Sequence, residues 1–172
     1  MPFARFPIHV LMCRRALVNR WVNEVWVPHA IEIAGAPGED VVVAVSPPVL
    51  VADSPAGAFW RHAGFALDLH PSEAEGYYLN VREPAPKIFV MWRRDDALRP
   101  PVYPVTVTAS YNEAARMLDG GELVDAVPMP PEILAWVAPF VAANYQPEPR
   151  RKVRRNDPFA AGAFVRDPKP ER

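Results

Sequence analysis

The sequence predicts an α+β protein with an antiparallel, partly barrel-like sheet over residues 6–108, followed by two C-terminal helices packed on it. Short apolar segments, several alternating with a period of two, fill the first hundred residues. Most of the 22 prolines fall between these segments, as expected for strands joined by rigid turns. A helical period begins only after Ser110. Because the strands come first and the helices last, the order favours α+β over α/β.

The apolar segments predict strands over residues 7–13, 22–33, 41–45, 65–69, 77–81, 87–92 and 102–108. Pro28 cannot donate to a strand ladder, so we expect an edge strand there, or two short strands with a bend. The valine-rich run 41–45 is typical of a strand that is buried on both faces. Together these strands indicate a meander with one solvated face, or a sheet curled into a partly open barrel.

Two helices and one short strand are expected after this sheet. Ser110 and Glu113 have the spacing of a capping box, and the glycine pair 120–121 ends the first helix. A short strand is predicted over residues 122–127. The second helix begins at Pro131 and carries a wide apolar stripe that would close the core.

The chain changes character at Pro147. Residues 150–172 contain eight Lys or Arg and three Asp or Glu, net +5, whereas residues 1–149 contain eleven and seventeen, net −6. We therefore expect one globular domain over residues 1–147 and a basic, proline-containing, flexible tail over residues 148–172. An acidic body with a basic tail is suited to docking.

Composition excludes several classes of protein. A single cysteine, Cys13, rules out an intramolecular disulfide framework. The N-terminus has no signal-peptide pattern, and no apolar run approaches the ~20 residues that span a bilayer. We therefore expect a cytoplasmic protein with no membrane insertion. Glycine-rich phosphate loops and nucleophile elbows are missing from the sequence, which predicts no catalytic motif, no metal site and no cofactor.

The richest polar group of side chains is His62, Asp68, His70 and Glu73. A histidine beside a carboxylate is typical of general acid–base chemistry or of a metal site, so a small-molecule enzyme or cofactor carrier is one hypothesis. The alternative is a solvated strand face followed by a turn, since no third ligand or nucleophile has a diagnostic spacing.

Candidate partner-binding residues lie at both ends of the chain. Among the five tryptophans, Trp21 is the one we expect to be exposed, because Arg20 and Asn23 flank it. The basic cluster comprises Arg150, Arg151, Lys152, Arg154 and Arg155. Such a cluster binds nucleic-acid phosphates or an acidic protein surface, or is simply a solvated end. An acidic body would repel a duplex, so nucleic acid is the less favoured partner.

Several segments together resemble a proteobacterial family of unknown function. They are the segments 19–26, 62–70 and 73–80, the pair of segments 127–130 and 136–137, and the segment 147–149 that leads into the basic cluster. Genes of that family commonly lie beside those of molybdenum- or tungsten-dependent formate dehydrogenases and their maturation factors. The resemblance implies a non-enzymatic accessory or assembly factor whose partner is formate dehydrogenase or one of its maturation factors. It implies no catalytic residues.

Overall fold

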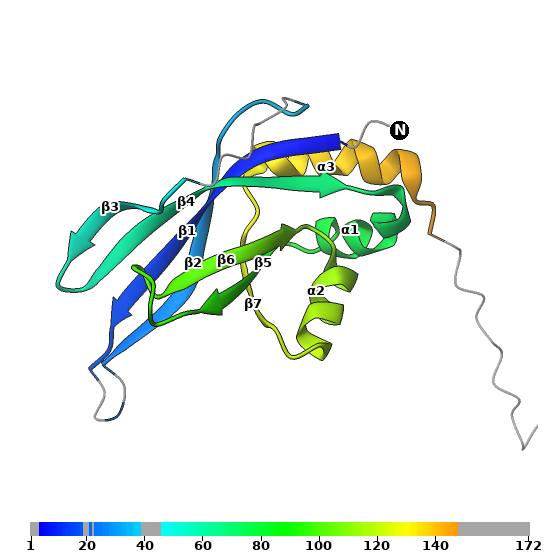
Figure 1. The fold of residues 1–172 in the computed structure, drawn as a ribbon. Coiled ribbons are helices and arrows are strands. Elements are labelled where there is room, and N and C mark those ends of the chain that lie inside the picture. Colours follow the sequence, from blue (N-terminus) through cyan, green and yellow to red (C-terminus); the bar gives the residue numbers. More distant parts are fainter. Residues whose placement is uncertain (1–3, 19–20, 22, 39–45, 148–172) are drawn as a thin grey trace, which may run out of the picture.

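Two antiparallel sheets and three helices form the protein (Figure 1), in a computed structural model that describes residues 4–18, 21, 23–38 and 46–147. The larger sheet has the order β2-β1-β4-β3 and contains β1 (Ala4–Ala16), β2 (Glu24–Ile33), β3 (Val49–Ser54) and β4 (Gly57–Leu69). The smaller sheet has the order β6-β5-β7 and contains β5 (Lys87–Arg94), β6 (Val102–Thr108) and β7 (Leu123–Pro128).

The helices connect and cover the sheets. A 3₁₀ turn (Pro71–Glu73) leads from β4 into α1 (Ala74–Val81), and α2 (Tyr111–Asp119) joins β6 to β7. The last described helix is α3 (Pro131–Asn144), which begins at a proline pair and packs against α1. In Figure 1 all three helices gather at one end of the molecule, and the β1–β2 and β3–β4 hairpins extend to the other.

Alternation along β1 determines which face of the larger sheet is buried. The even-numbered residues Phe6, Ile8, Val10 and Met12 are all buried, as expected for a strand with one core face. Their partners on β4 share that face, because directly opposed residues of an antiparallel pair point the same way.

One hydrophobic core contains residues of both sheets and of the helices. From α3, Ile133, Val137 and Val141 are buried in it at helical spacing. The ring of Trp136 meets Phe6 edge-on at a centroid distance of 5.2 Å, an arrangement that aromatic pairs prefer. The helix therefore closes the core beside β1.

α1 and α2 meet where a glycine allows close approach. A Cβ at Gly76 would stand 2.1 Å from Ser110 Oγ, so a larger residue would force the two helices apart. Ser110 caps α2 by accepting from the Glu113 amide at 3.1 Å, which confirms half of the capping box. The Glu113 carboxylate accepts from Thr108 instead of returning to the Ser110 amide.

The prediction of a single, partly barrel-like sheet over residues 6–108 is wrong. The strands form two separate sheets that are not closed into a barrel, and the second sheet ends in β7, beyond that range. The expected strand over residues 77–81 is helix α1, so the helices are not confined to the C-terminal part. Because α1 interrupts the meander after β4, the chain starts a new sheet at β5 instead of extending the first.

Most of the remaining elements match their prediction. The strands expected over residues 7–13, 65–69, 87–92 and 102–108 lie within β1, β4, β5 and β6, and both expected helices are present. The α+β class is confirmed. Strand β3 was not predicted, and the run 41–45 lies outside the described residues.

Candidate functional site

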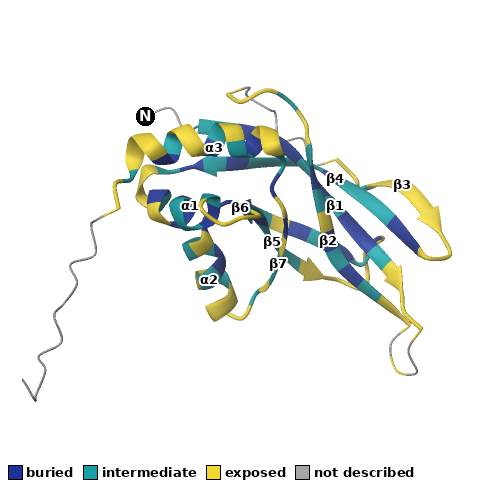
Figure 2. Cartoon of the chain, turned by 180° about the vertical axis from the view of Figure 1, so that it is seen from behind, coloured by how far each residue is buried: buried dark blue, intermediate teal, exposed yellow. Residues whose placement is uncertain are grey.

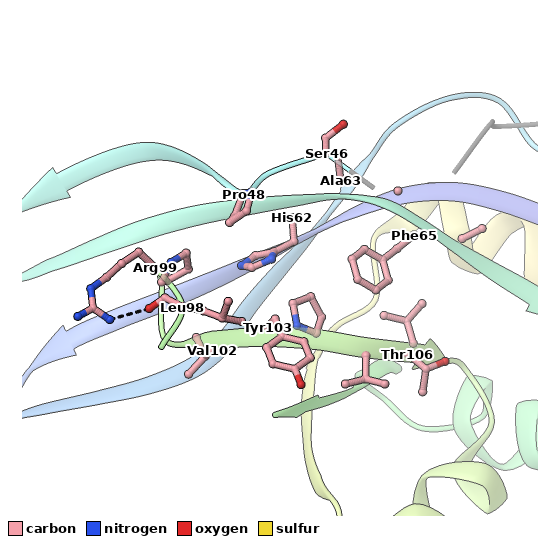
Figure 3. Close-up of a pocket in the computed structure, with 16 residues that line it drawn as sticks. Ser46, Pro48, His62, Ala63, Phe65, Leu98, Arg99, Val102, Tyr103 and Thr106 are labelled. Carbon is pink, nitrogen blue, oxygen red and sulfur yellow. Dashed lines mark hydrogen bonds between the residues drawn. The ribbon is translucent and has the colours of Figure 1, made fainter. Parts of the chain in front are cut away.

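A cleft of about 500 Å³ opens between the two sheets, where β4 faces β6. Residues 62–66 of β4 and 102–107 of β6 line its long sides, and residues 98–100 with Ser46 and Pro48 line its end. Figure 3 shows the His62 and Phe65 side chains reaching from β4 toward β6, where Tyr103 lies. We call this hollow the inter-sheet cleft.

Two β-bulges shape the cleft. In the β1–β4 pair, Ile8 faces Phe65 and Val10 faces His62, so one residue of β1 opposes Ala63 and Gly64 together. Gly64 has φ +86°, a conformation that favours glycine. In the β5–β6 pair the register shifts at Met91/Trp92 and leaves Val105 as the extra residue. Bulges re-aim side chains, and both of these lie on the cleft wall.

His62 is the polar residue enclosed in this wall. It is only 7% exposed, and its Nε2 is buried with no hydrogen-bond partner. Burial lowers the pKa of His62 to about 4, because the charged imidazolium would lose its hydration. Near neutral pH the side chain is therefore an uncharged imidazole, which has one donor and one acceptor.

The structure separates His62 from the other three residues of the predicted polar cluster. Asp68 accepts two hydrogen bonds from the Arg5 guanidinium, at 2.7 and 2.8 Å, on the opposite face of the sheet. Glu73 accepts from Ser110 Oγ at 2.8 Å and from Arg116 at 2.6 Å, which ties the 3₁₀ turn to α2. Both carboxylates therefore have structural partners.

His70 follows the end of β4, and its backbone N–H donates to the Tyr77 hydroxyl at 3.1 Å. That hydroxyl donates to the Asp68 carbonyl at 3.3 Å, and burial raises the pKa of Tyr77 to about 12. Among the described residues, no group of three or more His, Cys, Asp or Glu side chains is placed to hold a metal ion.

A second candidate surface lies at the tip of the β1–β2 hairpin. Three apolar side chains there are exposed: Leu17 by 40%, Val18 by 111% and Trp21 by 86%. The Leu17 N–H donates to the Asn23 carbonyl at 2.9 Å and closes this loop. We call Leu17, Val18 and Trp21 the hairpin-end surface. The structure places the predicted Trp21 in it, whereas sequence reasoning did not single out its two apolar neighbours.

The edge strand β3 is exposed along its whole length (yellow in Figure 2) and adds apolar residues near this end of the sheet. Val49, Leu50 and Val51 are exposed by 55%, 43% and 38%. The turn before β4 contacts β1 beside the hairpin, where the Ala16 N–H donates to the Ala56 carbonyl at 3.1 Å. Both hairpins therefore end at the same side of the molecule.

Sequence reasoning missed the β6 side of the inter-sheet cleft. The available signal was Gly64, because an isolated glycine within a strand pattern often marks a bulge. The five basic-cluster residues lie outside the described residues. In the described part, no helix combines the length and apolar character needed to cross a membrane.

Comparison with curated proteins gives no match, and comparison with solved structures gives none either. A family model described as "Protein of unknown function (DUF3305)" matches residues 7–154, which includes both candidate surfaces and most of the basic cluster. The chain therefore belongs to the DUF3305 family.

Proposed function

We propose that this protein is a non-enzymatic accessory factor that acts through protein–protein contacts in the maturation of a molybdenum- or tungsten-dependent enzyme such as formate dehydrogenase. The observation that carries the proposal is the hairpin-end surface, where Leu17, Val18 and Trp21 project from the tip of a long hairpin. Clustered exposed apolar side chains on a soluble domain mark interaction sites.

The composition of this surface suits a binding anchor. Tryptophan is enriched among the residues that dominate interface energies, because a large ring buries much area at small entropic cost. Arg14 and Arg15 lie at the base of the loop, and Arg14 is held by Asp53 at 3.4 Å and Glu24 at 3.7 Å. An apolar tip with the exposed Arg15 at its base fits a partner that presents an apolar pocket with an acidic rim.

The class of partner comes from the resemblance described above, which links the family to formate dehydrogenase and its maturation factors. The basic cluster supports an acidic partner, because five cationic side chains attract a negative surface before contact. In this proposal the tail steers the encounter and the hairpin end makes the apolar contact.

Affinity capture from the native host tests the proposal. The tagged full chain is compared with Val18→Ser/Trp21→Ser and with a control, Leu118→Ser/Leu123→Ser, which removes two exposed apolar side chains from α2 and β7. The wild type and the control should recover a molybdenum- or tungsten-dependent enzyme or its maturation factor. The hairpin variant should recover roughly tenfold less or lower, the size of a lost interface hot spot.

The possible results separate the two parts of the proposal. Recovery of no such enzyme or factor by the wild type would contradict the partner class. Equal recovery by the wild type and the hairpin variant would contradict the role of the hairpin-end surface. Deletion of the gene, followed by measurement of formate dehydrogenase activity and metal content, checks the maturation step directly; unchanged activity would count against it.

A further inference from the structure

We propose that the inter-sheet cleft is a binding site for an uncharged, largely apolar small molecule that carries a hydrogen-bonding group such as an amide. This site is separate from the hairpin-end surface, so the proposal goes beyond the function proposed above. Four observations carry it: the size of the cleft, its apolar walls, the two bulges that build it, and the orphaned nitrogen of His62.

The size and lining are those of a small-molecule site. The volume of about 500 Å³ lies within the roughly 300–1,000 Å³ usual for such clefts. Phe65 and Tyr103 supply aromatic surface from opposite walls, and the valines of β6 supply aliphatic surface. Sites of this kind combine apolar walls with a few polar groups that fix the orientation of the ligand.

The bulges show that the cleft is a built feature of both sheets. A regular β4 would continue the one-to-one register between Ile8 and Val10, but Ala63 and Gly64 interrupt it beside His62. A regular β6 would pair Val105, which instead is the extra residue on the facing wall. Two separate sheets thus depart from regular pairing at the same place.

His62 points to the chemistry of the ligand. A polar atom that is buried without a partner costs free energy, and it is normally satisfied by protein, water or ligand. The residue is only 7% exposed, and Nε2 is buried with no hydrogen-bond partner. Nε2 is closed off from the cleft in this conformation, so a ligand reaches it only when the ring turns toward the cleft. The uncharged imidazole has one donor and one acceptor, so an amide can then pair with it in either tautomer.

The charges around the cleft argue for an uncharged ligand. Among the described residues that line it, Arg99 alone carries a formal charge. Its guanidinium donates to the carbonyls of Asp96 and Leu98, at 2.9 and 2.7 Å, and Figure 3 shows it turned toward its own loop. A cation beside His62 would lose hydration without gaining a counter-charge, and an anion there would lie away from the guanidinium of Arg99, which is turned to its own loop.

Nuclear magnetic resonance of the full chain tests the proposal with three probes of similar shape. N-benzylacetamide is neutral and carries an amide, phenylacetate is an anion, and benzylammonium is a cation. The neutral amide should shift the resonances of His62, Phe65 and Tyr103 in a saturable way. Each charged probe should bind at least about tenfold more weakly.

Two variants and one control locate the binding. His62→Phe keeps an aromatic ring but removes both nitrogens, and it should weaken amide binding by about tenfold, the value of one good hydrogen bond. Val105→Trp keeps His62 but fills the cleft, and it should abolish binding. His29→Phe alters an exposed histidine of β2 and should leave binding unchanged.

Three results would overturn the proposal. They are the lack of a saturable shift with N-benzylacetamide, equal binding of a charged probe, and undiminished binding by Val105→Trp. If His62→Phe does not fold, the Val105→Trp result decides whether the cleft is the site. Val18→Ser/Trp21→Ser should bind the amide normally, so failure of the hairpin proposal and failure of this one are distinguishable.

Discussion

At the scale of the residue, His62 shows how far sequence proximity misleads. Its nearness to Asp68 and His70 in the sequence placed it with them in the predicted polar cluster. The β-bulge at Ala63 and Gly64 changes the alternation of β4, so His62 lies opposite Val10 on the core face. A single residue inserted in a strand sends every side chain beyond it to the other face, and one sequence alone does not reveal that insertion.

The buried state of His62 makes the stability of the protein depend on pH. Its pKa is about 4 in the folded chain, against about 6.5 when unfolded. Between these values the unfolded state binds more protons, so the contribution of neutral His62 is complete above about pH 6.5 and is lost toward pH 4. We expect the free energy of unfolding to fall by about 2 kcal/mol from pH 7 to pH 5 on account of this residue.

Urea denaturation at pH 5, 6 and 7 measures this effect. His62→Phe should remove most of the loss, whereas His29→Phe, a substitution at an exposed position, should keep it. If His62→Phe loses as much stability between pH 7 and pH 5 as the wild type, other groups are responsible and the buried imidazole is not.

Glu73 shows that the partners of a polar side chain can lie far away in the sequence. The sequence offered it as a member of a polar site, but its carboxylate is held by Ser110 and Arg116 of the α2 region, 37 and 43 residues further along the chain. The cap at Ser110 was predictable, because capping is local. The hydrogen bond from the Ser110 hydroxyl to Glu73 was not predictable, because it depends on how two distant segments pack.

At the scale of the element, α1 is the clearest failure of the sequence pattern. Aromatic and aliphatic residues over 77–81 favoured a strand, but long-range contacts impose a helix. Tyr77 is fully buried and contacts Phe140 of α3 at a ring distance of 6.0 Å. Asn80 is 2% exposed, and its side chain donates to Lys87 of β5 and to Ala109, the residue after β6. Tertiary contacts of this kind override local propensity.

Asn80 should be among the most sensitive polar positions of the fold. Its side-chain amide donates to the Lys87 carbonyl at 2.7 Å and to the Ala109 carbonyl at 2.8 Å, and it accepts from the Lys87 N–H at 2.9 Å. Asn80→Ala would leave buried backbone groups without partners. We expect it to lower the free energy of unfolding by roughly 2–4 kcal/mol.

The matched control for this prediction is Asn144→Ala. The Asn144 amide also donates to a carbonyl, that of Phe140 at 2.8 Å, but it does so at an exposed position. Its loss should cost about 0.5 kcal/mol or less, because water replaces the partner. Urea denaturation measures both losses. If the two substitutions lower the free energy of unfolding equally, the hydrogen bonds of Asn80 to Lys87 and Ala109 do not have the predicted weight.

At the scale of the whole molecule, the α+β class was predictable from the sequence, but the division of the strands into two open sheets was not. The order of apolar periods indicated α+β, and the structure confirms it. Whether the strands form one curled sheet or two depends on which edges meet. Here β4 and β6 face each other across the inter-sheet cleft without pairing, a relation that no local pattern encodes. The prediction of a barrel therefore failed at the place where the candidate site lies.

Charge is also organised over the whole molecule, with net −6 before residue 150 and net +5 from there on. The family match ends at residue 154, so it includes Arg150, Arg151, Lys152 and Arg154 and leaves out the last part of the tail. If the basic cluster steers the protein to an acidic partner, position along the tail should matter as well as total charge. Two triple variants of equal charge separate these possibilities.

The first triple variant is Arg150→Gln/Arg151→Gln/Lys152→Gln, within the family match, and the second is Arg166→Gln/Lys169→Gln/Arg172→Gln, beyond it. Binding to the captured partner is followed by surface plasmon resonance at about 50 and 300 mM salt. The first variant should associate about tenfold more slowly at low salt, because it has lost the charges that attract the partner before contact. Its association rate should also depend little on salt, because salt acts by screening those same charges. Its dissociation rate should change little, and the second variant should resemble the wild type. Equal slowing by both variants would mean that net charge alone is responsible, and no slowing by either would remove the basic cluster from the docking step.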